Sequence, residues 1–359
     1  MAKSLLVTGG AGFIGSNFVR YWYKHYGDRV VVLDALTYAG NRQNLAGFQQ
    51  NDTEDSRFVF VEGDVCDRAL IEQLLATYNI DTVVHFAAES HVDRSILGPG
   101  VFVRTNVVGT GVLLAAMCDR WQAQGNPDHY CFLQVSTDEV YGSLDMDAAP
   151  SVETDAYCPS SPYSASKAGA DHLVRAYYKT YGLPTIITCC SNNYGPYQFP
   201  EKLIPLMCLN ILLGKPLPIY GDGQNVRDWL HVHDHCSALA AVLEKGQPGS
   251  VYNIGGCSEM TNLAVVQRLC DLMAEAMGEL LPVEPRKLIT FVRDRPGHDL
   301  RYAMDITKIQ RETGWALTYD FASGLKQTVD WYLANRRWWE PLLSSEYEAY
   351  YKALYGKTF

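Results

Sequence analysis

The chain has 359 residues, with 30 Lys or Arg against 40 Asp or Glu, so its formal net charge is −10. An acidic total without a block of basic residues argues against a protein that coats nucleic acid, because that affinity comes mainly from neutralised phosphates. The length, the 47% hydrophobic content and ten scattered cysteines predict a soluble globular protein of about two domains with reduced thiols, and they exclude a small disulfide-stapled fold.

The chain is expected to have neither a membrane span nor a secretion signal. Apolar stretches such as residues 107–118 fall short of the roughly 20 residues that a membrane helix needs. Lys3 leads directly into a strand-like run and a glycine-rich turn, instead of the charged, apolar and small-residue series of a signal peptide. We therefore predict a cytoplasmic protein.

Apolar runs rich in β-branched residues recur through the first half of the chain and are expected to be buried strands. They cover residues 5–8, 30–33, 58–61, 82–86, 132–136 and 185–189. The segments between them have the apolar spacing of helices. Alternating strands and helices predict an α/β fold, a Rossmann-type parallel sheet flanked by helices.

The residue pattern changes after Asn192. Several prolines follow, and the predicted helices and strands are shorter than those in the first half of the chain. We predict a Rossmann domain over residues 1–191, with a returning segment at about 232–256 that adds a helix and one more strand. Residues 192–359 are then mainly a smaller C-terminal domain. Its aromatic tail is expected to be a terminal helix that docks.

Glycines 9, 12 and 15 lie between the first strand and the first helix. This context lets the backbone approach a pyrophosphate, whose charge the helix N-terminus stabilises. Asp34 ends the second strand, where a carboxylate can bind an adenosine ribose and repel a 2′-phosphate. Asp64, after the third strand, suits the adenine amino group. The first domain is therefore predicted to bind NAD rather than NADP, with FAD or a bare nucleotide as alternatives.

Tyr163 and Lys167 are four residues apart in a segment with helical spacing, so they should share one helix face. A nearby ammonium favours the phenolate and so suits Tyr163 to act as a base. Lys167 could also hold the nicotinamide ribose. Together with the glycine motif, this pair resembles the short-chain dehydrogenase/reductase superfamily, and the late second domain resembles its extended branch, which modifies nucleotide sugars.

Thr137, Asp138 and Glu139 follow the fifth strand, and ligands bind at the carboxyl ends of parallel strands. A dehydrogenase or epimerase of this superfamily needs only a hydroxyl there to assist the tyrosine. Two adjacent carboxyls exceed that requirement. Repulsion between the two carboxylates makes their pKa values differ, so that one can act as an acid while the other acts as a base.

With Tyr163 and Lys167, these three residues resemble the catalytic set of the dTDP-glucose 4,6-dehydratase family, and the similarity covers essentially the whole chain. Further segments that resemble the family's are 87–95, 191–197, 199–205 and 294–299. The resemblance implies an NAD-dependent hydro-lyase that converts dTDP-glucose to dTDP-4-keto-6-deoxyglucose and water, usually in dTDP-rhamnose biosynthesis.

The resemblance also implies a role for each catalytic residue. Tyr163, helped by Thr137, would take the proton of the C4 hydroxyl while C4 is oxidised. Glu139 would remove the C5 hydrogen, and a protonated Asp138 would give a proton to the departing C6 hydroxyl. Hydride would then return to C6, so that no net redox change occurs.

Binding residues follow from the same resemblance. Those for NAD are Gly9, Gly12, Phe13, Ile14, Gly15, Asp34, Leu36, Thr37, Asp64, Val65, Phe86, Ala87, Ala88, Ser90, Thr105, Tyr163, Lys167 and Asn193. Those for the nucleotide sugar are Ser90, Glu89, Thr137, Asn192, Lys202, Leu203, Pro218, Tyr220, Arg227, Asn262, Asp294, Arg295 and His298. Arginine suits a diphosphate because its planar fork donates two hydrogen bonds.

His231, His233 and His235 alternate along the sequence, so on a strand they would share a face that could be mistaken for a metal site. The family more usually shows Tyr and Glu at 231 and 233. That departure leaves the role of the three histidines open. We predict no metal, because the reaction needs none.

Other functions remain open at this point. A UDP-hexose 4-epimerase shares the glycine motif and the tyrosine and lysine pair but leaves Asp138 and Glu139 unexplained. A dehydratase for another nucleotide sugar would differ in loop shapes that set the base preference. A non-catalytic NAD sensor should lack one of the catalytic residues.

The predicted partner is the small-molecule substrate dTDP-glucose, without nucleic acid or membrane. The resemblance further suggests a homodimer. Its interface would be a four-helix bundle formed by residues 101–121 and 164–181 of each subunit.

Overall fold

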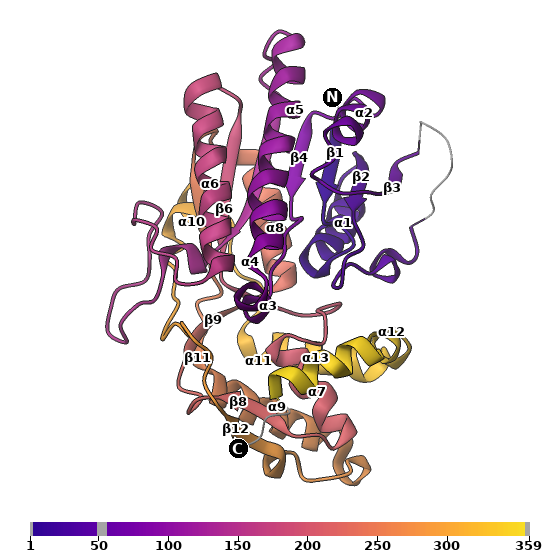
Figure 1. Cartoon of the computed structure of the whole chain (residues 1–359), viewed down its shortest axis with the longest axis vertical. Helices are drawn as coiled ribbons and strands as arrows, with labels where there is room; N and C mark the ends of the chain where they lie inside the picture. The colour runs from indigo at the N-terminus through magenta and orange to yellow at the C-terminus, as the bar shows by residue number, and fades with distance from the viewer. Residues whose placement is uncertain (1–2, 49–55, 356–359) are drawn as a thin grey trace.

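The structure, a computed structural model, describes residues 3–48 and 56–355. In these ranges the upper lobe of Figure 1 contains a seven-stranded sheet with the order β10-β6-β5-β4-β1-β2-β3, and every neighbouring pair is parallel. The strands are β1 (Ser4–Thr8), β2 (Arg29–Asp34), β3 (Phe58–Glu62), β4 (Thr82–His85), β5 (Cys131–Thr137), β6 (Thr185–Cys190) and β10 (Val251–Ile254). The predicted Rossmann-type parallel sheet is confirmed.

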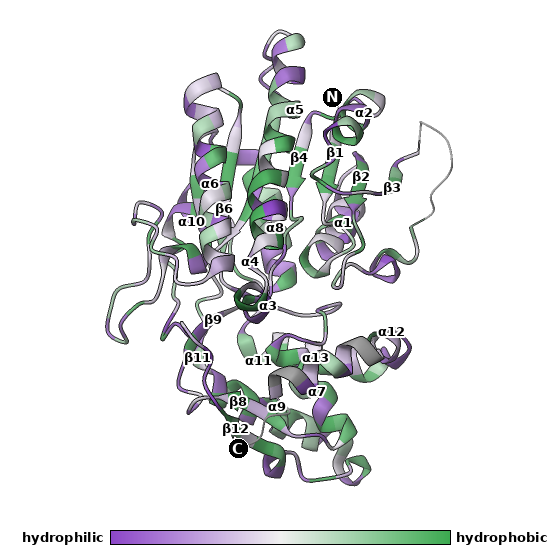
Figure 2. Cartoon of the chain, in the orientation of Figure 1, coloured by the Kyte–Doolittle hydropathy of each residue, from purple (hydrophilic) through white to green (hydrophobic). Residues whose placement is uncertain are grey.

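Helices cover both faces of this sheet because successive strand residues point to opposite sides. Leu5 and Val7 pack towards α1 (Phe13–His25), α8 (Val232–Lys245) and α10 (Thr307–Thr313). Leu6 packs on the other face, which is covered by α2 (Arg68–Thr77), α5 (Thr110–Ala123) and α6 (Pro162–Tyr181). Figure 2 shows hydrophobic residues along the strands and on these helices.

The second lobe lies below the sheet in Figure 1 and has its own apolar core. Its helices are α7 (Leu203–Leu213), α9 (Asn262–Met277), α11 (Phe321–Ala334), α12 (Arg336–Trp339) and α13 (Ser345–Tyr355). Its strands are β7 (Asn192–Tyr194), β8 (Leu217–Tyr220), β9 (Val226–His231), β11 (Glu259–Thr261) and β12 (Ile289–Val292).

Short 3₁₀ helices occur in both lobes. They are η1 (Arg42–Leu45), η3 (Asp138–Tyr141), η4 (Gly278–Leu280), η5 (Pro285–Leu288) and η6 (Glu340–Leu342).

The chain crosses between the lobes more than once. After β7 and β9 in the second lobe, α8 and β10 return to the sheet, where β10 pairs with β6. Helix α10 then packs on α8 and β10. The cleft between the lobes is therefore lined by segments that lie far apart in the sequence.

One helical segment is longer than the sequence analysis expects. After α3 (Val92–Leu97), helix α4 (Pro99–Phe102), a π-helical stretch η2 (Val103–Gly109) and α5 follow one another as one helix over Pro99–Ala123. By length and composition alone, it is the one helix in the described ranges that could cross a membrane, so the expectation that no apolar segment reaches this length is wrong. Half of its most apolar window is buried in the protein.

Candidate active site

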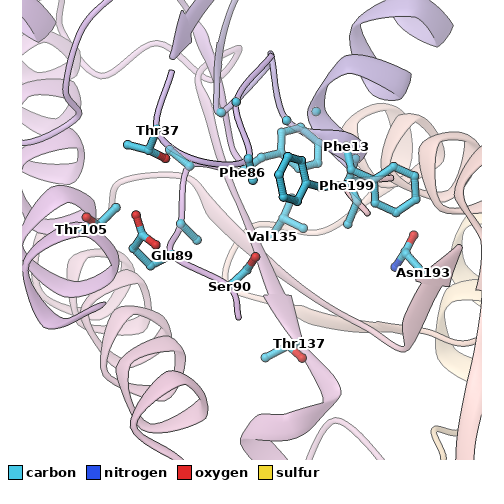
Figure 3. Close-up of a pocket in the computed structure, with 18 of the residues that line it drawn as sticks. Phe13, Thr37, Phe86, Glu89, Ser90, Thr105, Val135, Thr137, Asn193 and Phe199 are labelled. Atoms are coloured by element: carbon cyan, nitrogen blue, oxygen red, sulfur yellow. The ribbon is translucent and has the colours of Figure 1, made fainter. Parts of the chain in front are cut away.

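A cavity of about 340 Å³ opens at the carboxyl ends of the sheet strands. Figure 3 shows it, with Thr137 at the end of β5 and with Glu89 and Ser90 on the loop after β4. Among the described residues, every predicted cofactor residue except Leu36 lines this cavity. Leu36 instead packs against the core of the α1 and α8 face, and its backbone N–H donates to the carboxylate of Asp34.

Gly9, in the loop before α1, and Gly15, in the first turn of α1, have no room for a side chain. A Cβ atom on Gly9 would lie 2.6 Å from the backbone nitrogen of Ala87, and one on Gly15 would lie 2.2 Å from the Gly9 carbonyl oxygen. Gly9 also has a φ of +69°, which favours glycine. Helix α1 begins without a side-chain cap, so its first N–H groups are available to an anion. These features fit the pyrophosphate of a dinucleotide.

Acidic residues lie where the adenosine end of a dinucleotide is expected. The two Asp34 oxygens accept hydrogen bonds of 2.9 Å from the backbone N–H groups of Ala11 and Leu36. Burial raises the Asp34 pKa, and these hydrogen bonds oppose the rise. Asp64 also lines the cavity, but its oxygens are engaged by the Cys66 N–H and by Arg104 at 2.9 Å.

The three residues after β5 form a compact acid loop. Thr137 caps η3 by accepting a hydrogen bond from the Glu139 N–H, and its hydroxyl donates to Asp138 Oδ1 at 3.2 Å. Asp138 is buried, and its other oxygen has no hydrogen-bond partner among the described residues. Burial and the neighbouring charge of Glu139 raise the pKa of Asp138 well above its usual range. Asp138 is thus suited to carry a proton.

Glu139 has a different environment from its neighbour. Its side chain is half-buried, and burial raises its pKa, but Arg295, Arg227 and Lys202 all oppose that rise. These cations favour the carboxylate form. The two adjacent acids therefore suit opposite roles, with Asp138 as proton donor and Glu139 as base.

Helix α6 holds Tyr163 and Lys167 in its first turns. The helix starts sharply because Ser161 and Ser164 form a reciprocal capping box, with Pro162 at the first position. Both side chains are almost fully buried and both line the larger cavity. The Lys167 ammonium donates a hydrogen bond of 2.8 Å to the Val135 carbonyl.

The sequence predicts that the Lys167 ammonium favours the phenolate form of Tyr163, but the structure does not show this effect. Burial and the charge of Glu139 raise the Tyr163 pKa well above its usual range, and the hydrogen bond with Thr137 opposes this only in part. The ammonium of Lys167 is directed to the Val135 carbonyl instead. Within the protein alone, the phenol is held in its neutral form.

A second cavity of about 170 Å³ extends from the first towards the second lobe. The two cavities share the lining residues Ser90, Glu139, Asn192, Glu201 and Lys202. The predicted substrate residues that line the second cavity are Ser90, Asn192, Lys202, Leu203, Pro218, Tyr220, Arg227, Asn262, Arg295 and His298. Glu89 and Thr137 line only the first cavity. Asp294 lines neither, and its carboxylate lies 2.6 Å from His298 Nδ1, so it acts on His298.

Three cations, Lys202, Arg227 and Arg295, line the second cavity together with the carboxyl groups of Asp93, Glu139 and Glu201, and the cations suit a diphosphate. Lys202 donates to the Ser90 carbonyl at 3.0 Å. The buried Arg227 donates to the Asp299 carbonyl at 2.9 Å and lies over the ring of Tyr302. Arg295 approaches Asp93 at 3.9 Å. Each cation is thus held in place by the protein before any ligand binds.

Several lining residues were missed by the sequence analysis, among them Tyr38, Phe199, Glu201, Tyr302 and Tyr355. Tyr38 and Phe199 pack edge to face at 5.9 Å, and Glu201 forms an ion pair of 3.1 Å with Arg94. These contacts join the two lobes beside the larger cavity. Phe199 and Glu201 lie in the segment 199–205, whose resemblance to the family could have indicated them. The other missed residues had no such signal, because contacts between lobes leave no periodic pattern in the sequence.

The three alternating histidines do not lie on one strand. His231 ends β9, whereas His233 and His235 lie in the first turn of α8. His231 packs on Tyr319, with ring centres 4.0 Å apart, and His235 Nδ1 lies 2.9 Å from the Asn193 amide oxygen. Over residues 3–48 and 56–355, no cluster of His, Cys, Asp or Glu is arranged to hold a metal ion.

Comparison with known proteins identifies the family. Residues 6–328 match the model of the GDP-mannose 4,6 dehydratase family. A dTDP-glucose 4,6-dehydratase of Neisseria meningitidis is 53% identical over 353 residues, covering 96% of this chain and 97% of the relative.

Solved structures agree with this sequence match. DesIV, a dTDP-glucose 4,6-dehydratase from Streptomyces venezuelae crystallised with NAD, is 50% identical with a TM-score of 0.84 and covers 94% of this chain and 99% of its own. A UDP-glucose 4-epimerase from Thermotoga maritima has a TM-score of 0.80 but only 28% identity, covering 93% of this chain and 99% of its own. The fold is thus shared with epimerases, whereas the sequence follows the dehydratases, and the chain belongs to the dTDP-glucose 4,6-dehydratase family.

Proposed function

We propose that this protein is an NAD-dependent hydro-lyase that converts dTDP-glucose to dTDP-4-keto-6-deoxyglucose and water. The observation that carries the proposal is the position of Glu139, which lines both cavities and follows the buried Asp138. An acid and a base are thereby placed where the proposed cofactor cavity meets the cavity that contains Lys202, Arg227 and Arg295. The reaction of a 4-epimerase does not require this acid and base pair.

The larger cavity would hold NAD, with the glycine loop before α1 at the pyrophosphate and Asp34 at the adenosine ribose. When bound, NAD would supply a hydride acceptor for oxidation at sugar C4 and a hydride donor for reduction at C6. Lys202, Arg227 and Arg295 would bind the diphosphate of dTDP-glucose in the second cavity, which places the sugar near Glu139.

The chain's own residues then handle the protons. Tyr163 takes the proton of the C4 hydroxyl, and the Thr137 hydroxyl stabilises the developing phenolate by turning its proton from Asp138 to the phenol oxygen. A ketone at C4 acidifies the C5 hydrogen, which Glu139 removes as general base. Asp138, whose pKa is raised by burial, donates its proton to the C6 hydroxyl as water leaves.

Incubation of the purified protein with dTDP-glucose in deuterated water, without added NAD, tests this function. We expect mass spectrometry to show a product lighter by one water that carries one solvent deuterium at C5, because the proton at C5 is exchanged through Glu139 while the hydride returns to C6. If the substrate is unchanged, the incubation is repeated with added NAD and then with UDP-, CDP- and GDP-sugars. Inactivity with all of them would contradict the proposed function.

We also propose a homodimer formed through the helix Pro99–Ala123 together with α6. Val101, Val103 and Val108 on this segment are each about half exposed, as is Tyr181 on α6. Helices α5 and α6 pack against each other, so these side chains lie on adjoining helices. The same apolar side chains account for the membrane-like composition of the segment. A second copy that presents the same two helices would bury them in a four-helix bundle.

Replacing Val103 and Val108 together with glutamate should therefore convert the dimer to a monomer, since the interface would bury unpaired charges. Size-exclusion chromatography with light scattering measures the mass. A matched control is Leu280→Glu, which changes a residue of the second lobe that is 79% exposed and should leave the mass unchanged. A wild-type monomer would contradict the proposal.

The proposed compartment is the cytoplasm and the proposed setting is dTDP-rhamnose biosynthesis. The cysteines are free thiols in the structure, including the adjacent and buried pair Cys189 and Cys190. Free thiols suit a reducing compartment.

A further inference from the structure

A buried carboxylate that the reaction does not use lies next to the catalytic pair. Asp171 follows Lys167 by four residues on α6, as Lys167 follows Tyr163, so the three side chains share one helix face. Asp171 is fully buried between α6 and the sheet. An ionised side chain without solvent costs free energy unless it is paired, so its presence needs a reason.

The hydrogen bonds of Asp171 connect α6 to the strand that carries the acid loop. Asp171 Oδ2 accepts a hydrogen bond of 2.6 Å from the hydroxyl of Ser136, the residue directly before Thr137, and one of 3.2 Å from the Tyr157 hydroxyl. Asp171 Oδ1 has no partner among the described residues. The carboxyl group therefore only accepts hydrogen bonds. Burial raises the pKa of Asp171, whereas Lys167, the hydrogen bonds from Ser136 and Tyr157, and Arg175 oppose that rise and favour the anionic form.

Lys167 needs a negative charge nearby because its own surroundings disfavour an ammonium. It is buried, with the Val135 carbonyl of β5 as its hydrogen-bond acceptor, and burial lowers its pKa. The groups that face it from other elements are His85 on β4 and Cys189 and Cys190 on β6. Burial lowers the pKa of His85 to about 3 and raises that of Cys190 to about 12, so both are neutral near pH 7. Burial likewise keeps the Cys189 thiol protonated by raising its pKa.

We propose that Asp171 is a positioning residue for the catalytic pair: its anionic carboxylate keeps Lys167 an ammonium, and its hydrogen bond with Ser136 ties the end of β5 to α6. It touches neither cavity and acts through Lys167 and Ser136. This inference rests on the proposed function and on the predicted role of Lys167, whose ammonium would hold the nicotinamide ribose beside Tyr163.

The test compares the pH dependence of turnover at saturating dTDP-glucose in the wild type and in Asp171→Asn, which keeps the size of the side chain. Loss of the negative charge lowers the Lys167 pKa, and the ammonium exists only below that pKa. The alkaline limb of the variant's profile is therefore expected to move to lower pH by about one unit, the lower end of the effect of a nearby opposite charge. KM for dTDP-glucose should change little, because Asp171 does not line the substrate cavity.

Tyr157→Phe is the matched control, because it removes a hydrogen bond from the same carboxylate but leaves the charge. Thermal unfolding is measured for both variants, so that a difference in stability is not mistaken for a change in titration. Of the two, only Asp171→Asn should move the alkaline limb. Asp171→Leu is a second neutral variant that fills the buried space without a polar group and should move the limb in the same direction.

An unchanged alkaline limb in the neutral variants, or an equal movement in Tyr157→Phe, would overturn the inference and leave Asp171 a structural residue. The wild-type protein in the same assay distinguishes failure of the proposed function from failure of the role proposed for Asp171. If the wild type forms no dehydrated product, the proposed function fails. If it does and the limbs coincide, only the role of Asp171 is wrong.

Discussion

Replacing Tyr163 with phenylalanine is expected to lower turnover by about 100-fold to 10,000-fold, the range for loss of a general acid or base. The aromatic ring remains, so its edge-to-face contact with Phe102 at 6.3 Å is kept and the fold should change little. Only the hydroxyl that takes the C4 proton is lost. Steady-state turnover with dTDP-glucose measures the effect, and thermal unfolding verifies that the variant is folded.

Tyr141→Phe supplies the matched control. Tyr141 is also a buried tyrosine, but its hydroxyl donates to the Asn253 side chain at 2.8 Å and lines neither cavity. Its removal should cost stability of about 1 kcal/mol, the usual contribution of one hydrogen bond, and leave turnover nearly unchanged. Wild-type turnover in Tyr163→Phe would show that another group takes the C4 proton.

Replacing Glu139 with glutamine is expected to separate the first chemical step from the second. The amide has the size of the carboxyl group but cannot accept the C5 hydrogen, whereas Tyr163 remains able to take the C4 proton. Absorbance of reduced cofactor should therefore appear on addition of dTDP-glucose, while mass spectrometry detects the dehydrated product at least about 100-fold more slowly than with the wild type.

Glu153→Gln is the matched control, because it makes the same change of glutamate to glutamine outside the two cavities. Glu153 lines neither cavity, and its carboxylate accepts a hydrogen bond of 3.0 Å from the Asn253 backbone. Glu153→Gln should dehydrate dTDP-glucose at nearly the wild-type rate. Elimination at the wild-type rate in Glu139→Gln would mean that the C5 base is misassigned.

The features that the sequence predicts well are those determined by neighbouring residues. β-branched runs bounded by turns gave the sheet strands, and the glycines before α1 are needed because any side chain at Gly9 or Gly15 meets backbone atoms. The spacing of Tyr163 and Lys167 follows from helix geometry alone. Each of these signals lies within one strand, one turn or one helix.

The features that sequence reasoning missed depend on contacts between distant segments. Glu201 lines both cavities and forms an ion pair with Arg94, which comes from the other lobe. The direction of the Tyr163 pKa depends on burial and on Glu139, not on the residue four positions later. Likewise, the histidine pattern suggested a strand because alternation does not show where β9 ends and α8 begins.

The repeated crossing of the chain between its lobes limits how the enzyme can be divided and how it can move. A fragment that ends at residue 191 would lack α8 and β10, whose Leu239 and Tyr252 are fully buried in the core beneath the sheet. The cofactor lobe is therefore not expected to be a separable module in truncation or domain-exchange experiments. Because the chain crosses between the lobes several times, any opening of the cleft has to bend all of these crossing segments together and not a single linker.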